Sequence, residues 1–232
     1  MKAREIILKA LEEGRRKLLE HEAFIVAREY GLPVPEFGIA RTYEEAGEIA
    51  EKIGFPVVLK IVSPDISHKS DVGGVILNVN SKEEAIQAAK KIFENVKKHV
   101  PDARIEGVLV QKMAPKGLEV IIGGLRDNIF GSVVMFGLGG IFVEVLKDVS
   151  FRIAPITEGE ALEMMKEIKA AKLLEGYRGQ PPVDKKALAQ ILIKVATLLD
   201  ENPEIESIDL NPVLAYPDKA IVVDSRIILK PK

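Results

Sequence analysis

The hydrophobic residues of this chain recur with two different periods, and the changes of period mark the expected helices and strands. Over residues 3–30 the pattern is that of one or two amphipathic helices. Gly31, with Pro33 and Pro35 behind it, should end the last helix, because glycine adopts the backbone conformation that closes a helix and proline cannot continue one. A short extended segment over 34–40 is expected next.

Capping signatures divide the following part of the chain. Thr42 and Glu45 have the spacing of a capping box, so a helix should begin there and run to Gly54. The apolar run over 57–62 then predicts a strand. The other elements expected here are a strand over 75–79, a helix that starts after Ser81-x-x-Glu84 and ends near His99, and a strand over 105–113.

Beyond Pro115 the pattern changes to short apolar runs separated by Gly, Asp and Asn, which is typical of antiparallel strands. The expected elements are strands over 118–123, 131–136 and 149–153, helices after Thr157-x-x-Glu160 and near Asp184, and a final hairpin of 205–216 and 220–229. Hairpins combined with helices, without a long run of right-handed crossovers, indicate an α+β (mixed α/β) fold.

The length of 232 residues suits two lobes that each bury a core. The change of pattern near Pro115 predicts where they meet. We expect an N-terminal helical segment over 1–30, a small lobe over 31–113 and a larger lobe over 114–232. No internal repeat or low-complexity segment is visible.

Composition removes several classes of function. The chain has no cysteine, which excludes thiol catalysis and thiolate metal sites and suits a reducing cytoplasm. The formal net charge is −2, with 33 basic and 35 acidic residues, and tryptophan is absent, so nucleic acid is not an expected partner. No segment approaches 18 uncharged apolar residues and no signal peptide is recognisable, so we expect a cytoplasmic protein without a membrane partner.

A lysine interrupts the apolar strand over 57–62. Lys60 lies between Leu59 and Ile61, and a lysine in such surroundings needs an anion as partner. A nucleotide phosphate would fit. The alternative is that Lys60 discourages pairing at an exposed sheet edge, and the residues alone do not decide between the two.

The polar loop after this strand carries a histidine, His68. The Gly73-Gly74 pair would give the loop a flexible foot, so that His68 could be carried between two sites. The alternative is a solvated histidine without a role. The polar side chains around it are Ser67, Lys69, Ser70 and Asp71.

The final hairpin predicts a cation site from geometry. If Pro217-Asp218 forms a two-residue turn, Asn211 falls directly opposite Asp224, and Asp209 projects from the same face. Carboxylate and amide oxygens suit Mg²⁺. A different turn length, or a bulge at Pro212, would shift this register, and solvation of the hairpin end is the alternative explanation.

Three further features are weaker signals. The segment Gly137-Leu-Gly139-Gly140 fits neither common phosphate-loop pattern, so simple turn formation explains it better than a close backbone approach to a ligand. The residues Gln111-Lys112-Met113 lie where the two lobes join, and a nucleotide base could lie against such a hinge. Glu119 interrupts an apolar strand as Lys60 does, although an outward strand position explains it nearly as well.

Taken together, these motifs resemble the β subunit of an ADP-forming acetyl-CoA synthetase, a member of the ATP-grasp superfamily. The resemblance covers the chain from about Leu18 to its end. A succinyl-CoA synthetase β subunit is related but usually has a further C-terminal domain and a different loop around the histidine. The motifs are Leu32-Pro-Val-Pro35, Gly54-Phe-Pro-Val-Val-Leu-Lys60, Ser63-Pro-Asp-Ile-Ser-His-Lys69, Gly73-Gly-Val75, Glu119-Val-Ile-Ile-Gly-Gly124, Leu174-x-Gly-Tyr-Arg-Gly179 and Asp209-Leu-Asn-Pro-Val213.

The resemblance implies an ATP-grasp fold in which two lobes with antiparallel or mixed sheets sandwich a nucleotide, with ATP or ADP and Mg²⁺ as cofactors. The implied roles are Lys60 on the α and β phosphates, Gln111, Lys112, Met113 and Ala114 on the adenine edge, Glu119 on the ribose, Asn211 and Asp224 on magnesium, and Asp209 as an acidic residue needed for activity.

In such proteins the residue matching His68 is transiently phosphorylated and passes the phosphoryl group to ADP. The implied net reaction converts acyl-CoA, ADP and phosphate into free acid, CoA and ATP. It requires a CoA-binding α subunit, and we expect an α2β2 heterotetramer. The alternatives are a free-standing ATP-grasp carboxylate ligase, which needs neither His68 nor a partner, and a non-catalytic ATP-sensing subunit.

Overall fold

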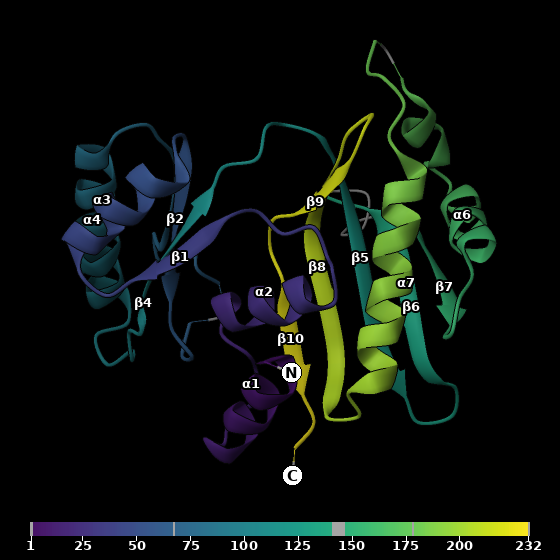
Figure 1. The fold of residues 1–232 in the computed structure, drawn as a ribbon, viewed down its shortest axis with the longest axis horizontal. Helices are drawn as coiled ribbons and strands as arrows, with labels where there is room; N and C mark the ends of the chain where they lie inside the picture. The colour runs from purple at the N-terminus through teal and green to yellow at the C-terminus, as the bar shows by residue number, and fades with distance from the viewer. Residues whose placement is uncertain (1, 67, 141–146, 178, 232) are drawn as a thin grey trace. The chain divides into compact units, whose positions relative to one another are not determined.

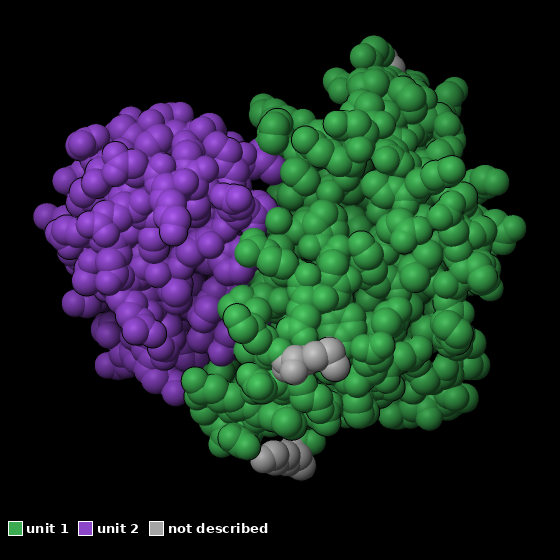
Figure 2. Space-filling model, viewed as in Figure 1, with its two compact units in different colours: residues 1–18, 23–34, 115–232 green, residues 19–22, 35–114 purple. Residues whose placement is uncertain are grey.

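The computed structural model describes residues 2–66, 68–140, 147–177 and 179–231. Figure 2 shows the two compact units into which the chain divides. Unit 1 comprises residues 1–18, 23–34 and 115–232, and unit 2 comprises residues 19–22 and 35–114. None of the helices in the described parts of the chain is long and apolar enough to cross a membrane.

Unit 2 is built on a four-stranded antiparallel sheet with the strand order β1-β4-β2-β3. Helices α3 and α4 pack together over this sheet (Figure 1). The elements are β1 (Phe37–Ala40), α3 (Tyr43–Ile53), β2 (Val57–Val62), β3 (Val75–Val79), α4 (Lys82–His99) and β4 (Gly107–Lys112).

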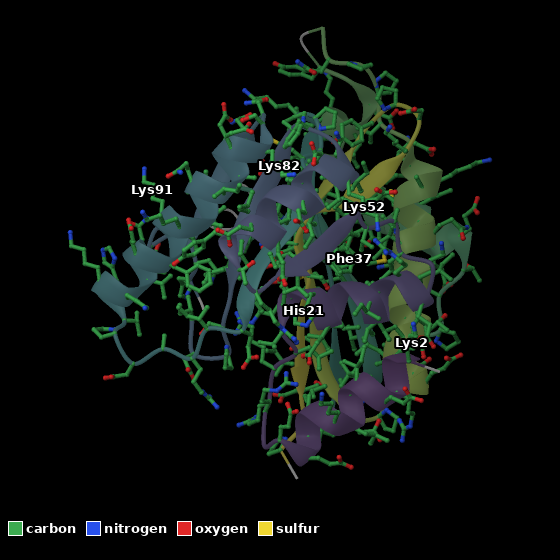
Figure 3. All side chains as sticks on the ribbon, turned by 60° about the vertical axis from the view of Figure 1, so that its left-hand side comes forward. Lys2, His21, Phe37, Lys52, Lys82 and Lys91 are labelled. Atoms are coloured by element: carbon green, nitrogen blue, oxygen red, sulfur yellow. The ribbon has the colours of Figure 1, made fainter. Side chains whose placement is uncertain are left out.

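The two helices of unit 2 begin where their caps predict. The side chains of Thr42 and Ser81 accept hydrogen bonds from the third residue of each helix. Small residues let the helices approach closely, since a Cβ added at Gly47 would lie 2.8 Å from the Ile86 side chain. Charged residues such as Lys91 are on the outer surface (Figure 3). The core therefore forms between sheet and helices.

Unit 1 contains a larger antiparallel sheet with the order β10-β8-β5-β6-β7, and β9 pairs with β8. Helix α7 runs along one face of this sheet, with α6 beside it (Figure 1). The strands are β5 (Leu118–Asp127), β6 (Gly131–Leu138), β7 (Val149–Ile153), β8 (Ile205–Ala215), β9 (Ala220–Val222) and β10 (Arg226–Leu229). The helices are α1 (Lys2–Glu12), α2 (Glu20–Glu29, whose first residues belong to unit 2), α6 (Glu158–Glu167), the short 3-10 helix η1 (Ala171–Glu175) and α7 (Lys185–Glu201).

The two faces of the larger sheet differ. On β5, Val120 and Ile122 are fully buried, and a Cβ at Gly124 would collide with the Leu199 side chain of α7, so these alternate residues face the helix. The intervening residues, Glu119 among them, face away from α7. Asp209 pairs with Gly123 and therefore shares the face of Glu119.

Most expected elements are present, and the α+β fold class is confirmed. The strands over 75–79 and 149–153 have the expected bounds, whereas β5 and β6 run longer than expected. The expectation of one continuous strand over 220–229 is wrong, because residues 223–225 leave the ladder between β9 and β10. They lie opposite Pro212, which has no N–H to donate across a ladder.

We expect the substitution Thr157→Ala to lower the free energy of unfolding by roughly 1 kcal/mol, the usual loss for a helix cap. The Thr157 hydroxyl accepts from the Glu160 amide, and this amide loses its partner in the variant, whereas the backbone amide of residue 157 can still donate to the Glu160 carboxylate. Guanidinium denaturation measures the change. The matched control is Thr197→Ala on the exposed surface of α7, where the hydroxyl only bonds the Ile193 carbonyl and the change should be near zero.

Candidate functional site

Lys60 lies on an interior strand. It pairs with Val75 of β3 and with Leu109 of β4, so β2 has a neighbour on each side. The residue is only 8% exposed. The alternative that Lys60 protects an exposed sheet edge is therefore wrong, and the need for an anionic partner holds.

The anion that Lys60 contacts in this structure is Glu20, at the start of α2. The Lys60 ammonium donates to Glu20 Oε1 at 2.6 Å, and the Lys69 ammonium donates to Glu20 Oε2. The Glu20 side chain is 3% exposed. Our sequence analysis missed this residue, since only its place among the acidic residues of an amphipathic segment marks it and its partners lie 40 and 49 positions away.

Two opposing effects act on the Glu20 carboxyl. Burial raises its pKa, because a low dielectric disfavours the charged form. The nearby ammonium groups of Lys60 and Lys69 outweigh burial, and the pKa of Glu20 ends below its usual value. Glu20 is thus an ionised carboxylate shared between two cations.

His68 is exposed on the loop that connects β2 to β3. An ion pair fixes the N-terminal side of this loop: Asp65 accepts from the Arg104 backbone N–H at 2.8 Å and from Nη2 at 2.8 Å. The Arg104 guanidinium lowers the pKa of Asp65 to about 2. Ser67, the expected neighbour of His68, lies outside the described residues.

The glycine pair fixes the other side of the loop by close packing instead of forming a flexible foot. The Gly74 amide donates to the Lys69 carbonyl at 2.7 Å, and the Asn95 side chain donates to the Gly73 carbonyl at 3.1 Å. Gly73 has a φ of 64°, and a Cβ there would lie 2.6 Å from the Asn95 amide nitrogen. His68 therefore lies between two firmly held loop ends.

The hinge residues belong to the end of β4. Gln111 is buried, and the Lys112 ammonium donates to the carbonyls of Gly54 at 3.0 Å and Phe55 at 2.7 Å. The amides of Lys112 and Met113 donate to the carbonyls of Glu36 and Pro56. A ligand at this hinge would have to use other backbone groups, such as those of Ala114. The Lys112 side chain itself is engaged within unit 2.

Glu119 is exposed near the start of β5, and Gly139 packs against it. The Gly139 amide donates to the Glu119 carbonyl at 2.9 Å, and a Cβ at Gly139 would lie 3.0 Å from the Glu119 Cβ. Gly139 thus approaches the backbone of Glu119 closely, and an approach of this segment to a ligand stays a prediction. The adjoining residues 141–146 lie outside the described part of the chain.

The final hairpin has the expected register. The Tyr216 amide donates to the Lys219 carbonyl across a two-residue turn, and both Val213 with Val222 and Asp209 with Arg226 keep the expected pairing. Asn211 and Asp224 take opposed positions in the gap between β9 and β10 and are not themselves a ladder pair. The register of β8 against β5 also shifts by one residue at this point, as a bulge at Pro212 would produce.

The carboxylates at this gap repel each other. Burial raises the pKa of Asp209, the nearby Asp224 carboxylate raises it further, and Arg226 partly opposes both. Two such carboxylates beside the Asn211 amide form a donor set that fits a hard divalent cation such as Mg²⁺. Ser225, next to Asp224, is buried, and its hydroxyl has no hydrogen-bond partner among the described residues. No group of three or more His, Cys, Asp or Glu side chains is placed to share a metal in the described ranges.

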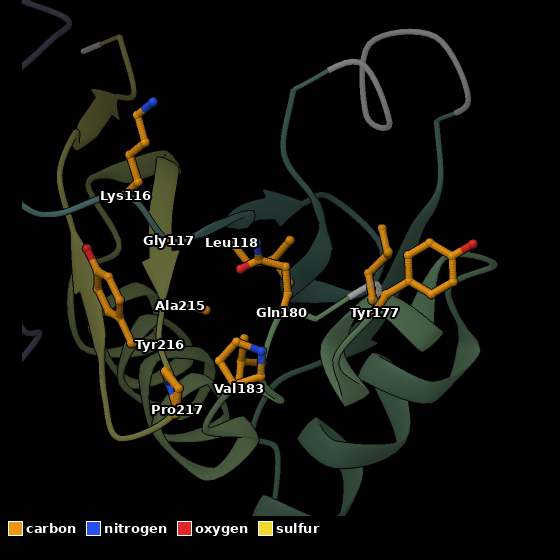
Figure 4. A pocket seen from close by; sticks show the side chains of 11 residues that line it. Lys116, Gly117, Leu118, Tyr177, Gln180, Val183, Ala215, Tyr216 and Pro217 are labelled. Atoms are coloured by element: carbon orange, nitrogen blue, oxygen red, sulfur yellow. The ribbon is translucent and has the colours of Figure 1, made fainter.

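A separate pocket of about 420 Å³ lies in unit 1. Figure 4 shows Tyr216 and Tyr177 on opposite sides of it, with Gln180 between them. The Tyr216 hydroxyl donates to the Pro115 carbonyl at 2.6 Å, and burial raises the pKa of this hydroxyl. The predicted site residues do not contribute to the lining. Tyr177 belongs to the motif over 174–179, of which residue 178 is not described.

Comparison with known proteins gives a family for this arrangement. A family model described as an ATP-grasp domain matches residues 9–229. The acetate–CoA ligase [ADP-forming] I subunit beta of Pyrococcus furiosus is 56% identical over 228 residues, with 98% of each chain covered. The chain belongs to this family of ADP-forming acetate–CoA ligase β subunits. The acetate–CoA ligase [ADP-forming] I of Archaeoglobus fulgidus is 53% identical over 98% of the chain, which matches 33% of that longer protein.

Solved structures of an acetyl-coenzyme A synthetase agree with this assignment. The acetyl-coenzyme A synthetase 1 of Ca. Korarchaeum cryptofilum in complex with coenzyme A and Ca-AMPCP superposes with a TM-score of 0.96 at 56% identity, covering 98% of this chain and 100% of that one. In a second structure of this protein the phosphohistidine segment is phosphorylated and has a site I orientation (TM-score 0.93, 54% identity). In a third, with Mg-AMPPCP, the segment points towards the nucleotide binding site (TM-score 0.88, 52% identity). Each match covers 98% of this chain and all of the other.

These findings confirm several expectations. The ATP-grasp fold, the membership of the acetate–CoA ligase family, the ligase activity of that family and its use of an adenine nucleotide with a divalent cation are all confirmed. The designation of ligase β subunits, together with the fusion in Archaeoglobus fulgidus, implies an α-type partner for such chains. The roles of the individual residues stay predictions.

The Asp65 anchor should depend on pH. Because the pKa of Asp65 is lowered from 3.8 to about 2, its contribution is complete above about pH 4 and is lost as the pH falls through 2. We expect Asp65→Asn at pH 5 to lower the protection of the loop amides, relative to their intrinsic exchange at that pH, to the level that wild type reaches only near pH 2. Exchange followed by mass spectrometry measures this. Glu51→Gln, which breaks the exposed Lys82–Glu51 pair, should leave the loop unchanged.

Proposed function

We propose that this chain is the nucleotide-binding β subunit of an ADP-forming acyl-CoA synthetase and that His68 carries the phosphoryl group to ADP. The observation that carries the proposal is an exposed histidine on a loop with anchored ends, eight residues after a buried lysine, in a chain of this family. The net reaction is acyl-CoA plus ADP and phosphate giving free acid, CoA and ATP. We expect it to take place in the cytoplasm.

The proposed transfer is a displacement at phosphorus. A β-phosphate oxygen of ADP attacks the phosphoryl group of phosphohistidine 68, the nitrogen–phosphorus bond breaks, and the ring, protonated on its other nitrogen, leaves as neutral imidazole. Lys60 supplies positive charge to the α and β phosphates, and Glu119 binds the ribose. Gln111, Lys112, Met113 and Ala114 border the adenine.

Asn211 and Asp224 would hold Mg²⁺, with Asp209 acting on the same face of the sheet. The ion neutralises charge on the phosphates when it is bound. The mutual repulsion of Asp209 and Asp224 supports this assignment, because a divalent cation relieves it.

The chain is proposed to act with a CoA-binding α subunit in an α2β2 assembly. The subunit names of its relatives and the longer fused ligases support the partner. His68 would then move between the nucleotide and the partner, as the two orientations of the phosphohistidine segment in the Korarchaeum enzyme suggest.

Transfer of radiolabel from [γ-³²P]ATP tests the role of His68. We expect acid-labile, alkali-stable label on the wild-type chain, with more than about a thousandfold loss of turnover in His68→Asn, since no other group takes over the nucleophile's part. His99→Asn is the matched control, because His99 is another exposed histidine, whose ring Nδ1 contacts the Asn95 carbonyl on the same helix. It should keep both label and turnover.

Other outcomes would favour the alternatives. Full turnover in His68→Asn without any labelled chain would indicate a free-standing ATP-grasp carboxylate ligase. Binding of MgATP without label or turnover, with the α-type partner present, would indicate a non-catalytic ATP-sensing subunit.

Magnesium dependence tests the hairpin site. We expect Asn211→Ala or Asp224→Ala to raise the Mg²⁺ concentration for half-maximal turnover by at least about tenfold. In other metal sites, removing a ligand or a residue that orients a ligand weakens metal binding to that extent. Asp218→Ala is the control, since Asp218 is an exposed carboxylate at the tip of the same hairpin. An equal Mg²⁺ requirement in all three variants would contradict the site.

A further inference from the structure

Two lysine side chains of unit 2, those of Lys60 and Lys69, share the carboxylate of Glu20. The two oxygens of Glu20 accept from different lysines, Oε1 from Lys60 and Oε2 from Lys69. The side chains of Glu20, Lys60 and Lys69 are 3%, 10% and 19% exposed, so solvent replaces little of either contact. Each lysine has a different place in the proposed function: Lys60 contacts nucleotide phosphates, and Lys69 directly follows His68.

A buried carboxylate cannot lose both cations at once. Leaving one charge of a buried pair without its counter-charge is strongly unfavourable, because neither water nor the protein then stabilises it. Either lysine can leave while the other stays. The departure of one therefore strengthens the hold of Glu20 on the other.

The position of Lys69 ties this carboxylate to the movement of His68. The anchors at Asp65 and at Gly73 lie three and five residues from the histidine, whereas Lys69 is its immediate neighbour. A segment that carries His68 away must move Lys69 as well. The related Korarchaeum enzyme adopts two orientations of its phosphohistidine segment.

We propose that Glu20 is a positioning residue that couples nucleotide binding at Lys60 to retention of the His68 loop through Lys69. When phosphates draw Lys60 away, Glu20 keeps Lys69, and His68 stays with its unit. When the loop leaves with Lys69, Glu20 keeps Lys60, and phosphate binding weakens. This inference rests on the proposed roles of Lys60 and His68.

Hydrogen exchange of the loop amides, with and without saturating MgADP, tests the coupling in the complex of the chain with its CoA-binding partner. In wild type we expect MgADP to slow exchange in the loop by at least about fivefold, the low end of common couplings between sites. Glu20→Gln and Lys69→Met should both abolish this dependence on MgADP. Glu51→Gln, which breaks an exposed ion pair on α3, should preserve it.

Affinity for MgADP gives a second readout. Lys69→Met should weaken binding and Glu20→Gln should strengthen it, and in the double variant Lys69→Met should have no further effect. Simple long-range electrostatics would instead give additive changes. Lys69→Met keeps the Glu20–Lys60 pair, so it decides the question even if Glu20→Gln does not fold.

The failures are distinguishable. If the wild-type complex does not bind MgADP, the proposed function is wrong and the coupling falls with it. If wild type binds MgADP, and MgADP slows loop exchange as much in Lys69→Met as in wild type, the coupling through Glu20 is wrong while the proposed function stands. Faster exchange that MgADP still slows would indicate a merely structural pair and would also overturn the proposal.

Discussion

The buried ammonium of Lys60 is the constraint on which unit 2 depends. Little water reaches that charge, because the Lys60 side chain is only 10% exposed, so the fold has to bring a counter-charge to it. Glu20 meets this need from α2, far away in sequence. Since the same carboxylate also accepts from Lys69, the middle of the loop between β2 and β3 is held by the group that neutralises Lys60. Core stability and loop position thus share one interaction.

Local signals predicted the fold well. Thr42, Ser81 and Thr157 each cap the helix that their spacing with a glutamate indicates, because a capping box depends only on neighbouring residues. The register of the last hairpin also followed, since a two-residue turn fixes every later pair. The gap at 223–225 did not follow from the turn, because it lies opposite Pro212, which has no N–H to donate across the ladder.

The sequence predicted the polar residues of the candidate site but not the residues that hold them in place. Lys60 and His68 stand out because each departs from its surroundings. Glu20 does not, since an acidic residue on an amphipathic helix is ordinary until burial and partners are known. The same holds for Gly139, which packs against Glu119 but belongs to no phosphate-loop pattern that would mark it in the sequence.

The contacts of Lys112 change how variation at the hinge should be read. Its ammonium bonds two carbonyls at the C-terminal end of α3, where a positive charge complements the helix dipole. Substitutions of Lys112 among relatives should therefore affect the stability of the C-terminal end of α3 more than the preference for a nucleotide base. A search for relatives with a different base preference should therefore compare the backbone conformation at Met113 and Ala114. The identity of the residue at position 112 should say less about the base.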